Sequence, residues 1–253
     1  MNRLKRIGLI LALLGTLLIG SGVILGQLMA EKGYRGNVTT TEHEFSGIRE
    51  LVAISTSLPI DVRYGDETNV KVKYTGALPL VFSEENGLLR ITQDDTFTLN
   101  LFSAEQLNAG IEIILPHKPF GSITLSSSSG NITANSLNAD TYEISTKSGD
   151  ISLGSIDERA AIRSESGDIS FSLSSINGDM TVNGGDGDIL AEISEEASFC
   201  LEFLTYGGHF TSYAFDKEYD YSFGDAAAIR NGGKHLLRIN TKGGNLSINL
   251  KDN

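Results

Sequence analysis

The stretch SGNI at residues 129–132 returns as SGDI at 148–151 and 166–169, and as DGDI at 186–189. Looser copies, GHF and GNL, stand at 208–210 and 244–246. The apolar residues that close these six copies are separated by 19, 18, 20, 21 and 36 positions, so the last interval has room for two repeats. A nearly constant period of about 20 residues is typical of a solenoid, in which each repeat forms one coil and buries its inner face against its neighbours.

Apolar pairs spaced by two residues precede the glycine turns at equivalent positions. The pairs are Ile123/Leu125, Tyr142/Ile144, Ala160/Ile162, Met180/Val182, Leu201/Phe203 and Leu237/Ile239. This spacing places both side chains on one face of a β-strand. We therefore predict an all-β fold, a β-solenoid resembling a single-stranded β-helix, with positive φ at the turn glycines. The alternative is an antiparallel sandwich of hairpins, but in-register apolar positions over about six repeats favour the solenoid.

The segment 45–120 has the same strand character without the strict repeat. Alternation of apolar and polar residues, with turn formers such as Gly65-Asp66 in between, predicts several strands. The predicted strands are Leu51–Ile54, Ile60–Tyr64, Val70–Tyr74, Leu88–Thr92 and Ile111–Leu115. We expect residues 97–107 to form a loop.

Residues 7–30 contain no charged side chain, and a helix needs about 20 apolar residues to cross a bilayer. Arg3, Lys5 and Arg6 precede this segment and Glu31 follows it, so the positive-inside rule predicts a cytoplasmic N-terminus and an extracytoplasmic remainder. A cleaved signal peptide is the alternative, but its apolar run would be about 7–15 residues, and Leu28 stands where cleavage needs a small residue. We expect an uncleaved single-pass anchor that contacts membrane lipid.

The charge of the chain restricts its partners. The net charge is −12, and without the three basic residues before the apolar segment there remain 17 basic and 32 acidic residues, a net charge of −15. Such an acidic outer part argues against nucleic acid and anionic lipid as partners. Cys200 is the single cysteine and cannot form an internal disulfide, so packing and backbone pairing must hold the fold together.

Several stretches resemble a known bacterial family, over roughly residues 45–250. They are Phe45–Ile48 (FSGI), Ile60–Val62 (IDV), Val70–Val72 (VKV) and Ile113–Pro116 (IILP), followed by SSGNI at 128–132 and the serial SGDI copies. These resemble the "putative adhesin" β-strand-repeat family, a domain of unknown function that includes LiaG-type membrane-anchored proteins found beside cell-envelope stress operons. The resemblance implies a β-solenoid on the outer face of a mostly Gram-positive-type envelope, and it implies no known activity.

The sequence contains no recognisable catalytic motif. His43, His117, His209 and His235 lie far apart, without the spacing of metal ligands. Gly-x-Ser-x-Gly, phosphate-loop and HExxH motifs are absent. We therefore predict that the protein is not an enzyme and has no cofactor.

An acidic row is the most suggestive polar feature. Asp150, Asp168 and Asp188 occupy one position of successive repeats, flanked by Asn131 and Asn245. Stacked carboxylates about 5 Å apart repel one another by roughly 1–3 kcal/mol, which backbone N–H groups, water or a cation must offset. The run GGDGDI at 184–189 resembles a calcium-binding nonapeptide repeat, although its Asp comes one residue early.

These observations leave three interpretations of the acidic residues. We favour carboxylates that cap their own turns. The weak calcium candidates are Asp150, Asp168, Asp186 and Asp188. An acid–base pair in a sugar-cleaving solenoid is a third possibility, but such enzymes add long loops around a cleft, and these repeats are short.

The predicted organisation is a cytoplasmic stub and transmembrane helix (1–30), a polar tether (31–44), an N-terminal β portion (45–120) and β-solenoid repeats (121–253). The function that fits best is a non-catalytic interaction or scaffold module linked to cell-envelope stress, with a neighbouring membrane protein as partner because the tether is short. An adhesin-like binder of polysaccharide or protein is the alternative, and a carbohydrate-cleaving β-helix enzyme is more remote. The sequence names no ligand.

Overall fold

A computed structural model of the chain describes residues 38–76, 80–93, 109–135, 137–212, 219–221, 224–230 and 232–251. The predicted anchor at 1–30 and the predicted loop at 97–107 lie outside these residues. No helix in the described ranges is long and apolar enough to cross a membrane.

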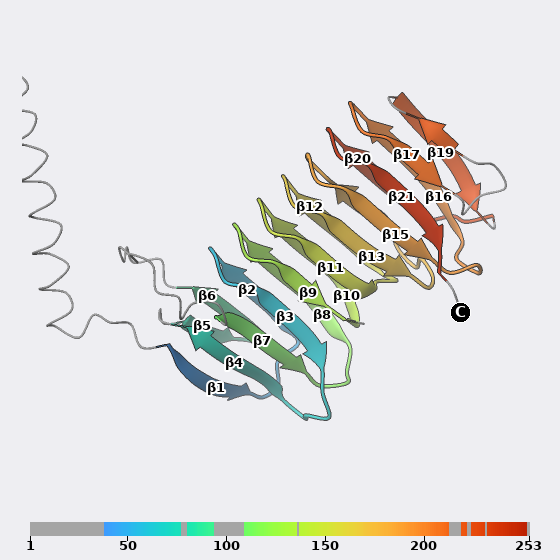
Figure 1. The fold of residues 1–253 in the computed structure, drawn as a ribbon. Helices are drawn as coiled ribbons and strands as arrows, with labels where there is room; N and C mark the ends of the chain where they lie inside the picture. Colours follow the sequence, from blue (N-terminus) through green and yellow to red (C-terminus); the bar gives the residue numbers. More distant parts are fainter. Residues whose placement is uncertain are drawn as a thin grey trace, which may run out of the picture. The chain divides into compact units, whose positions relative to one another are not determined.

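The regular elements of the described residues are β-strands, which form two sheets (Figure 1). In spatial order, sheet A contains β1 (Thr39–Phe45), β4 (Val70–Gly76), β7 (Gly110–Leu115), β3 (Ile60–Tyr64), β9 (Ile132–Ala134), β11 (Ile151–Ser155), β13 (Ile169–Leu173), β15 (Ile189–Ile193), β21 (Leu246–Leu250), β17 (Phe210–Ser212) and β18 (Tyr219–Tyr221). Sheet B contains β5 (Leu80–Glu85), β6 (Leu88–Gln93), β2 (Glu50–Ser55), β8 (Phe120–Ser127), β10 (Ala139–Thr146), β12 (Arg159–Ser164), β14 (Met180–Asn183), β20 (Leu236–Thr241), β16 (Phe199–Thr205) and β19 (Gly224–Arg230).

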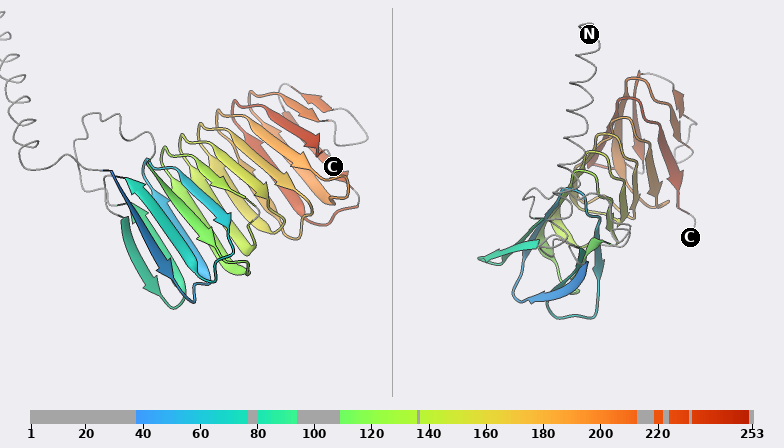
Figure 2. Two further views of the ribbon diagram at one scale, coloured as in Figure 1. Left: turned by 60° about the horizontal axis from the view of Figure 1, so that its bottom comes forward. Right: turned by 60° about the vertical axis from the view of Figure 1, so that its left-hand side comes forward.

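Each coil contributes one strand to sheet B, turns, and then contributes one strand to sheet A. The coils stack side by side with parallel pairing, as Figure 2 shows for the central strands. The stacking confirms the solenoid and rules out the antiparallel sandwich for this part of the chain.

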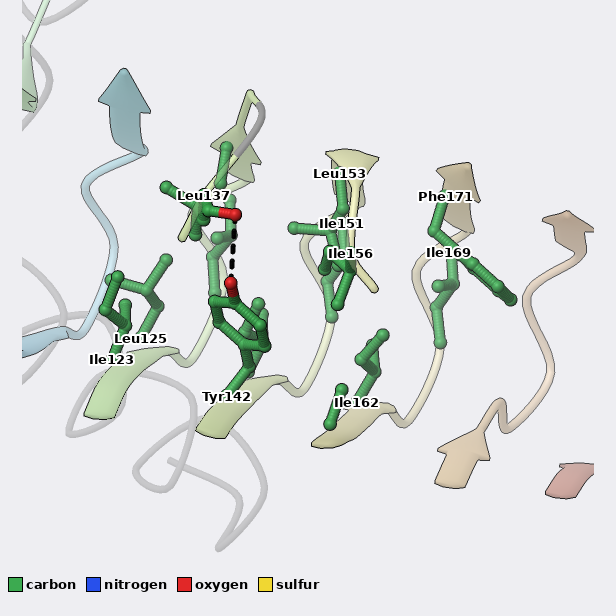
Figure 3. Packing of buried hydrophobic residues seen from close by; sticks show 14 of the residues in the cluster. Ile123, Leu125, Leu137, Tyr142, Ile151, Leu153, Ile156, Ile162, Ile169 and Phe171 are labelled. Atoms are coloured by element: carbon green, nitrogen blue, oxygen red, sulfur yellow. Dashed lines mark hydrogen bonds between the residues drawn. The ribbon is translucent and has the colours of Figure 1, made fainter. Parts of the chain in front are cut away.

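The core lies between the two sheets, where the predicted apolar pairs meet in register (Figure 3). Ile144 is aligned with Leu125 on one side and with Ile162 on the other. Ile169 is aligned with Ile151 and Ile189, and all three are almost completely buried. The strands predicted in 45–120 are also present and belong to the same two sheets.

Two strands had no clear signal in the sequence. β1 lies largely within the segment expected to be a tether, and its side chains are exposed except for the half-buried Phe45. β5 is also mostly exposed. Both lie at sheet edges and have no buried face that would require alternation of apolar and polar residues.

The order of the coils departs from the order of the sequence near the C-terminal end. The coil β20/β21 lies between β14/β15 and β16/β17, with parallel pairing on both sides. The expectation that the 36-residue interval between Phe210 and Leu246 holds two further coils is therefore wrong. Two antiparallel edge strands come from that interval: β18 beside β17, and β19 beside β16.

The turn glycines are explained by close approach between coils. In the described residues positive φ occurs at Asn86, Gly47, Gly87 and Gly232, so the expectation of positive φ in the repeat turns is wrong. A Cβ added to Gly167 would overlap the carbonyl oxygen of Gly149, and one on Gly149 would overlap that of Gly130. The same overlap recurs along the stack, which explains why each turn must lack a side chain at this position.

Candidate functional site

The structure brings Asp150, Asp168 and Asp188 into one row at the start of the sheet A strands. Asn131, Asp150, Asp168, Asp188, Asn245 and His209 follow one another along the row in the order of the stacked coils. The row is exposed to solvent.

Each Asn or Asp side chain of this row accepts a hydrogen bond from the next coil. The backbone N–H of Asp168 donates to Oδ1 of Asp150 at 3.0 Å, and that of Asp188 donates to Oδ1 of Asp168 at 2.8 Å. Asn245 donates both its backbone and its side-chain N–H to Oδ1 of Asp188, at 2.7 and 2.9 Å. The expectation that each Asp caps its own turn is wrong, because the carboxylates connect neighbouring coils.

The turns are capped by hydroxyl side chains that the sequence analysis missed. The N–H of Gly149 donates to Oγ1 of Thr146 at 3.0 Å, and the N–H of Gly167 donates to Oγ of Ser164 at 2.9 Å. Both hydroxyl residues are buried. The signal was present in the sequence, since a Ser or Thr stands three residues before the glycine in several copies of the repeat.

The row brings no three potential metal ligands together in the described residues. Asp186 lies outside it, on the exposed turn, where its backbone N–H donates to the carbonyl of Glu165 at 3.1 Å. No three His, Cys, Asp or Glu side chains in the described parts of the chain are grouped so that they could hold a metal ion. Calcium binding by the acidic row stays an untested alternative to the prediction that these residues bind no metal.

Short polar side chains cover large parts of both outer faces. On sheet A, a shallow hollow is lined by members of the acidic row together with Ser152, Ser170 and Ser247. On sheet B, a second hollow is lined mainly by hydroxyl and charged residues: Ser122, Thr124, Thr141, Glu143, Arg159, Asp179 and Thr181. Several successive coils contribute outward polar side chains to each hollow. Each face can therefore present many hydrogen-bonding groups to a large partner.

A charged cluster lies on the outer face of sheet A near β1. The guanidinium of Arg63 contacts Oε1 of Glu112 at 2.7 Å, and Nζ of Lys73 lies 3.7 Å from Oε2 of the same residue. Partial burial and the neighbouring charge of Glu112 raise the pKa of Asp61, while Arg63 opposes that shift. The sequence showed Asp61 and Arg63 only as the polar positions of a strand.

Tyr142 has a structural role in the core. Its hydroxyl donates to the carbonyl of Leu137 at 2.9 Å, as Figure 3 shows, and accepts from the N–H of Ala139 at 2.7 Å. Burial raises its pKa to about 12. Both bonds hold the corner that leads into β10, so the phenol is not available as an acid or base for a ligand.

The family of the chain follows from a direct match. A family model described as Toastrack DUF4097 matches residues 48–161 and, in a second overlapping match, residues 141–249. The chain belongs to the Toastrack DUF4097 family. The matches cover the coils of both sheets and confirm the resemblance to a β-strand-repeat domain of unknown function.

Two solved structures that are similar to the chain carry adhesion-related descriptions. A "putative cell adhesion protein" from Clostridium sporogenes is 14% identical, over 85% of this chain and 100% of the other, with a TM-score of 0.51. A "putative adhesin" from Bacteroides fragilis is 11% identical, over 85% and 97% of the two chains, with a TM-score of 0.37. At these identities the first similarity shows a shared fold, and the second carries no argument. The comparison with curated protein sequences finds no match.

Proposed function

We propose that this Toastrack protein is a single-pass membrane protein whose β-solenoid works outside the cytoplasm as a non-catalytic interaction module of the cell envelope. The observation that carries the proposal is the pair of extended outer faces built by stacked, similar coils. Each face repeats small hydroxyl and charged side chains along the stack. Such a surface suits a large partner better than a small substrate, which is bound most often in a concave and mostly apolar pocket.

The polar groups of these faces support a binding role over a catalytic one. In the row Asp150–Asp168–Asp188, one oxygen of each carboxylate is occupied by a backbone N–H of another coil. At the other end of sheet A, Glu112 is engaged by Arg63 and Lys73. A general acid or base needs access to a proton on a bound substrate, and these groups serve instead to hold coils and strands together.

The tether favours a partner near the membrane. β1 begins at Thr39, so eight residues, 31–38, separate the proposed anchor at 7–30 from the first strand. Even fully extended, eight residues span at most roughly 30 Å. We therefore favour a scaffold that contacts another membrane protein over an adhesin that reaches outward, and the resemblance to LiaG-type proteins supports a link to cell-envelope stress.

The proposal can be tested with the full chain in intact cells. A photo-activatable amino acid is placed at Ser170 on the outer face of sheet A or at Ala161 on the outer face of sheet B. We expect covalent adducts with an integral membrane protein from at least one position, and we expect protease added outside the cells to degrade the β-solenoid. Adducts only with polysaccharide or a soluble extracellular protein would favour the adhesin, and a β-solenoid protected from external protease would contradict the topology.

A further inference from the structure

The coil β20/β21 makes its pairing contacts with coils that precede it by many residues. β20 pairs with β14 and β16, and β21 pairs with β15 and β17, all in parallel. β19, which comes directly before it in the sequence, pairs with β16 on the side away from β20. The coil therefore fills a slot between two other coils instead of extending the end of the stack (Figure 1).

The slot is complementary to this coil in its core and at its edge. Leu237, Ile239, Leu246 and Ile248 are completely buried. In the polar row, Asn245 donates to Asp188 on one side and accepts from the N–H of His209 on the other. Without the coil, strand edges of both sheets would lose their partners, and unpaired parallel edges favour pairing with another strand.

A short crossing joins the coil to the rest of the described strands. Residues 232–235 lead into β20, which lies on the opposite side of β16 from β19. Gly232 in this crossing has a φ of 66°. The crossing is held to β16 by the N–H of Cys200, which donates to the carbonyl of His235 at 2.8 Å, and by Sγ of Cys200, which donates to that of Gly233 at 3.1 Å.

We propose that β20/β21 is an exchangeable coil through which two copies of the chain assemble, the coil of each copy filling the slot of the other. A swapped coil makes the same strand pairs and the same buried contacts as the coil of the closed monomer. The two forms therefore differ only in the connection between β19 and β20 and in the cost of association, which is the condition under which domain swapping is inexpensive. The central coils are joined on both sides to other described strands, so none of them can be exchanged through a single crossing.

The test uses two differently tagged full-length copies, co-expressed in one cell. Thr181 and Arg238 are aligned across β14 and β20. One copy carries T181C and the other carries R238C, with Cys200→Ser in both, and a short cross-linker with two thiol-reactive maleimide groups is added. We expect a cross-linked product that contains both tags, because the Arg238 position of one copy lies beside the Thr181 position of the other.

Two controls make the result decisive. A single chain with both T181C and R238C must link, internally in the closed monomer or between copies in the swapped form, which verifies the fold of the variants. The matched pair E143C and A161C is aligned across the central strands β10 and β12 and should link within one chain but not between copies. Internal linking of T181C/R238C without a product carrying both tags would overturn the proposal, as would equal linking between copies for the central pair.

Discussion

The central coils and the two ends of the stack follow different rules. From β8 to β15 the coils stack in the order of the sequence, each aligned with the one before it. At each end one coil is displaced inward: β2/β3 lies between β6/β7 and β8/β9, just as β20/β21 lies between β14/β15 and β16/β17. The repeat therefore defines the positions within a coil and not the neighbour that the coil will have.

Both ends also differ from the central coils in how their strands are paired. Antiparallel strands complete both sheets at each end: β4, β1 and β5 at one end, and β18 and β19 at the other. The edge strands β1 and β5 carry Glu42, Glu44, Glu84 and Glu85. Charged side chains on an edge discourage pairing with other molecules, so these strands close a stack that would otherwise present parallel edges.

The largest expected effect is the burial of a charge in a central coil. Ile169→Asp places a carboxylate between Ile151 and Ile189 and should reduce the free energy of unfolding by about 4 kcal/mol or more. Ser170→Asp, on the outward face of the same strand, should cost well under about 1 kcal/mol. Chemical denaturation of the two variants measures the difference, and equal stability would show that the register of β13 is wrong.

The glycine stack gives the next largest effect. Gly167→Ala forces a methyl group against the carbonyl of Gly149 and should destabilise the fold by about 2–3 kcal/mol, since rigid backbone must move. Gly121→Ala is the control, because its added Cβ would lie 3.8 Å from the nearest atoms. We expect the control to melt at nearly the wild-type temperature. A similar loss of stability in both variants would mean that the adjacent coil does not exclude a side chain at position 167.

The raised pKa of Tyr142 predicts that the free energy of unfolding decreases at alkaline pH. Its pKa rises from 10.0 to about 12 in the fold, so the neutral phenol stabilises the native state below pH 10, and this contribution is lost as the pH rises through about 12. Tyr142→Phe leaves the N–H of Ala139 and the carbonyl of Leu137 without their partner and should cost about 1–3 kcal/mol at neutral pH. The difference in unfolding free energy between wild type and variant should shrink between pH 10 and 12, and a constant difference would contradict this account.

Two threonines allow a direct comparison of a central coil, which contains Thr146, with the coil β20/β21, which contains Thr241. Thr146→Val leaves the N–H of Gly149 unpaired and should cost about 1–2 kcal/mol. In the coil β20/β21, Oγ1 of Thr241 is buried without a hydrogen-bond partner among the described residues. Thr241→Val should therefore leave the melting temperature unchanged or raise it, and a loss equal to that of Thr146→Val would show that the two turns are capped alike.

The smallest effect is expected in the acidic row. Asp168→Asn keeps an acceptor for the N–H of Asp188 and should change stability by well under about 1 kcal/mol, whereas Asp168→Ala removes the acceptor and should cost more. Calcium and a chelator should give the same melting temperature. If the row binds calcium, the ion at 100 times its dissociation constant would add about 2.7 kcal/mol, and a rise that disappears in an Asp150→Asn, Asp168→Asn double variant would establish the site.

The features that depend on a single coil could be predicted from the sequence. The apolar pair Tyr142/Ile144 and the glycine turn that follows predicted a strand, a turn and an inward Ile, and the structure confirms all three. These features could be predicted because alternation and spacing act within about 20 residues. The position of Asp168 in a row with Asp150 and Asp188 was predicted for the same reason.

Which coils are neighbours became clear from the three-dimensional fold alone. Leu246 and Phe210 occupy equivalent positions, so either could have been placed beside Ile189, and the repeat holds no information that distinguishes them. The adjacent coil also decides which N–H donates to Oδ1 of Asp188. It likewise explains why position 187 must be glycine. The physical reason is that hydrogen bonds and contacts between coils join residues that are far apart in the sequence, and equivalent repeats make many such pairings locally alike.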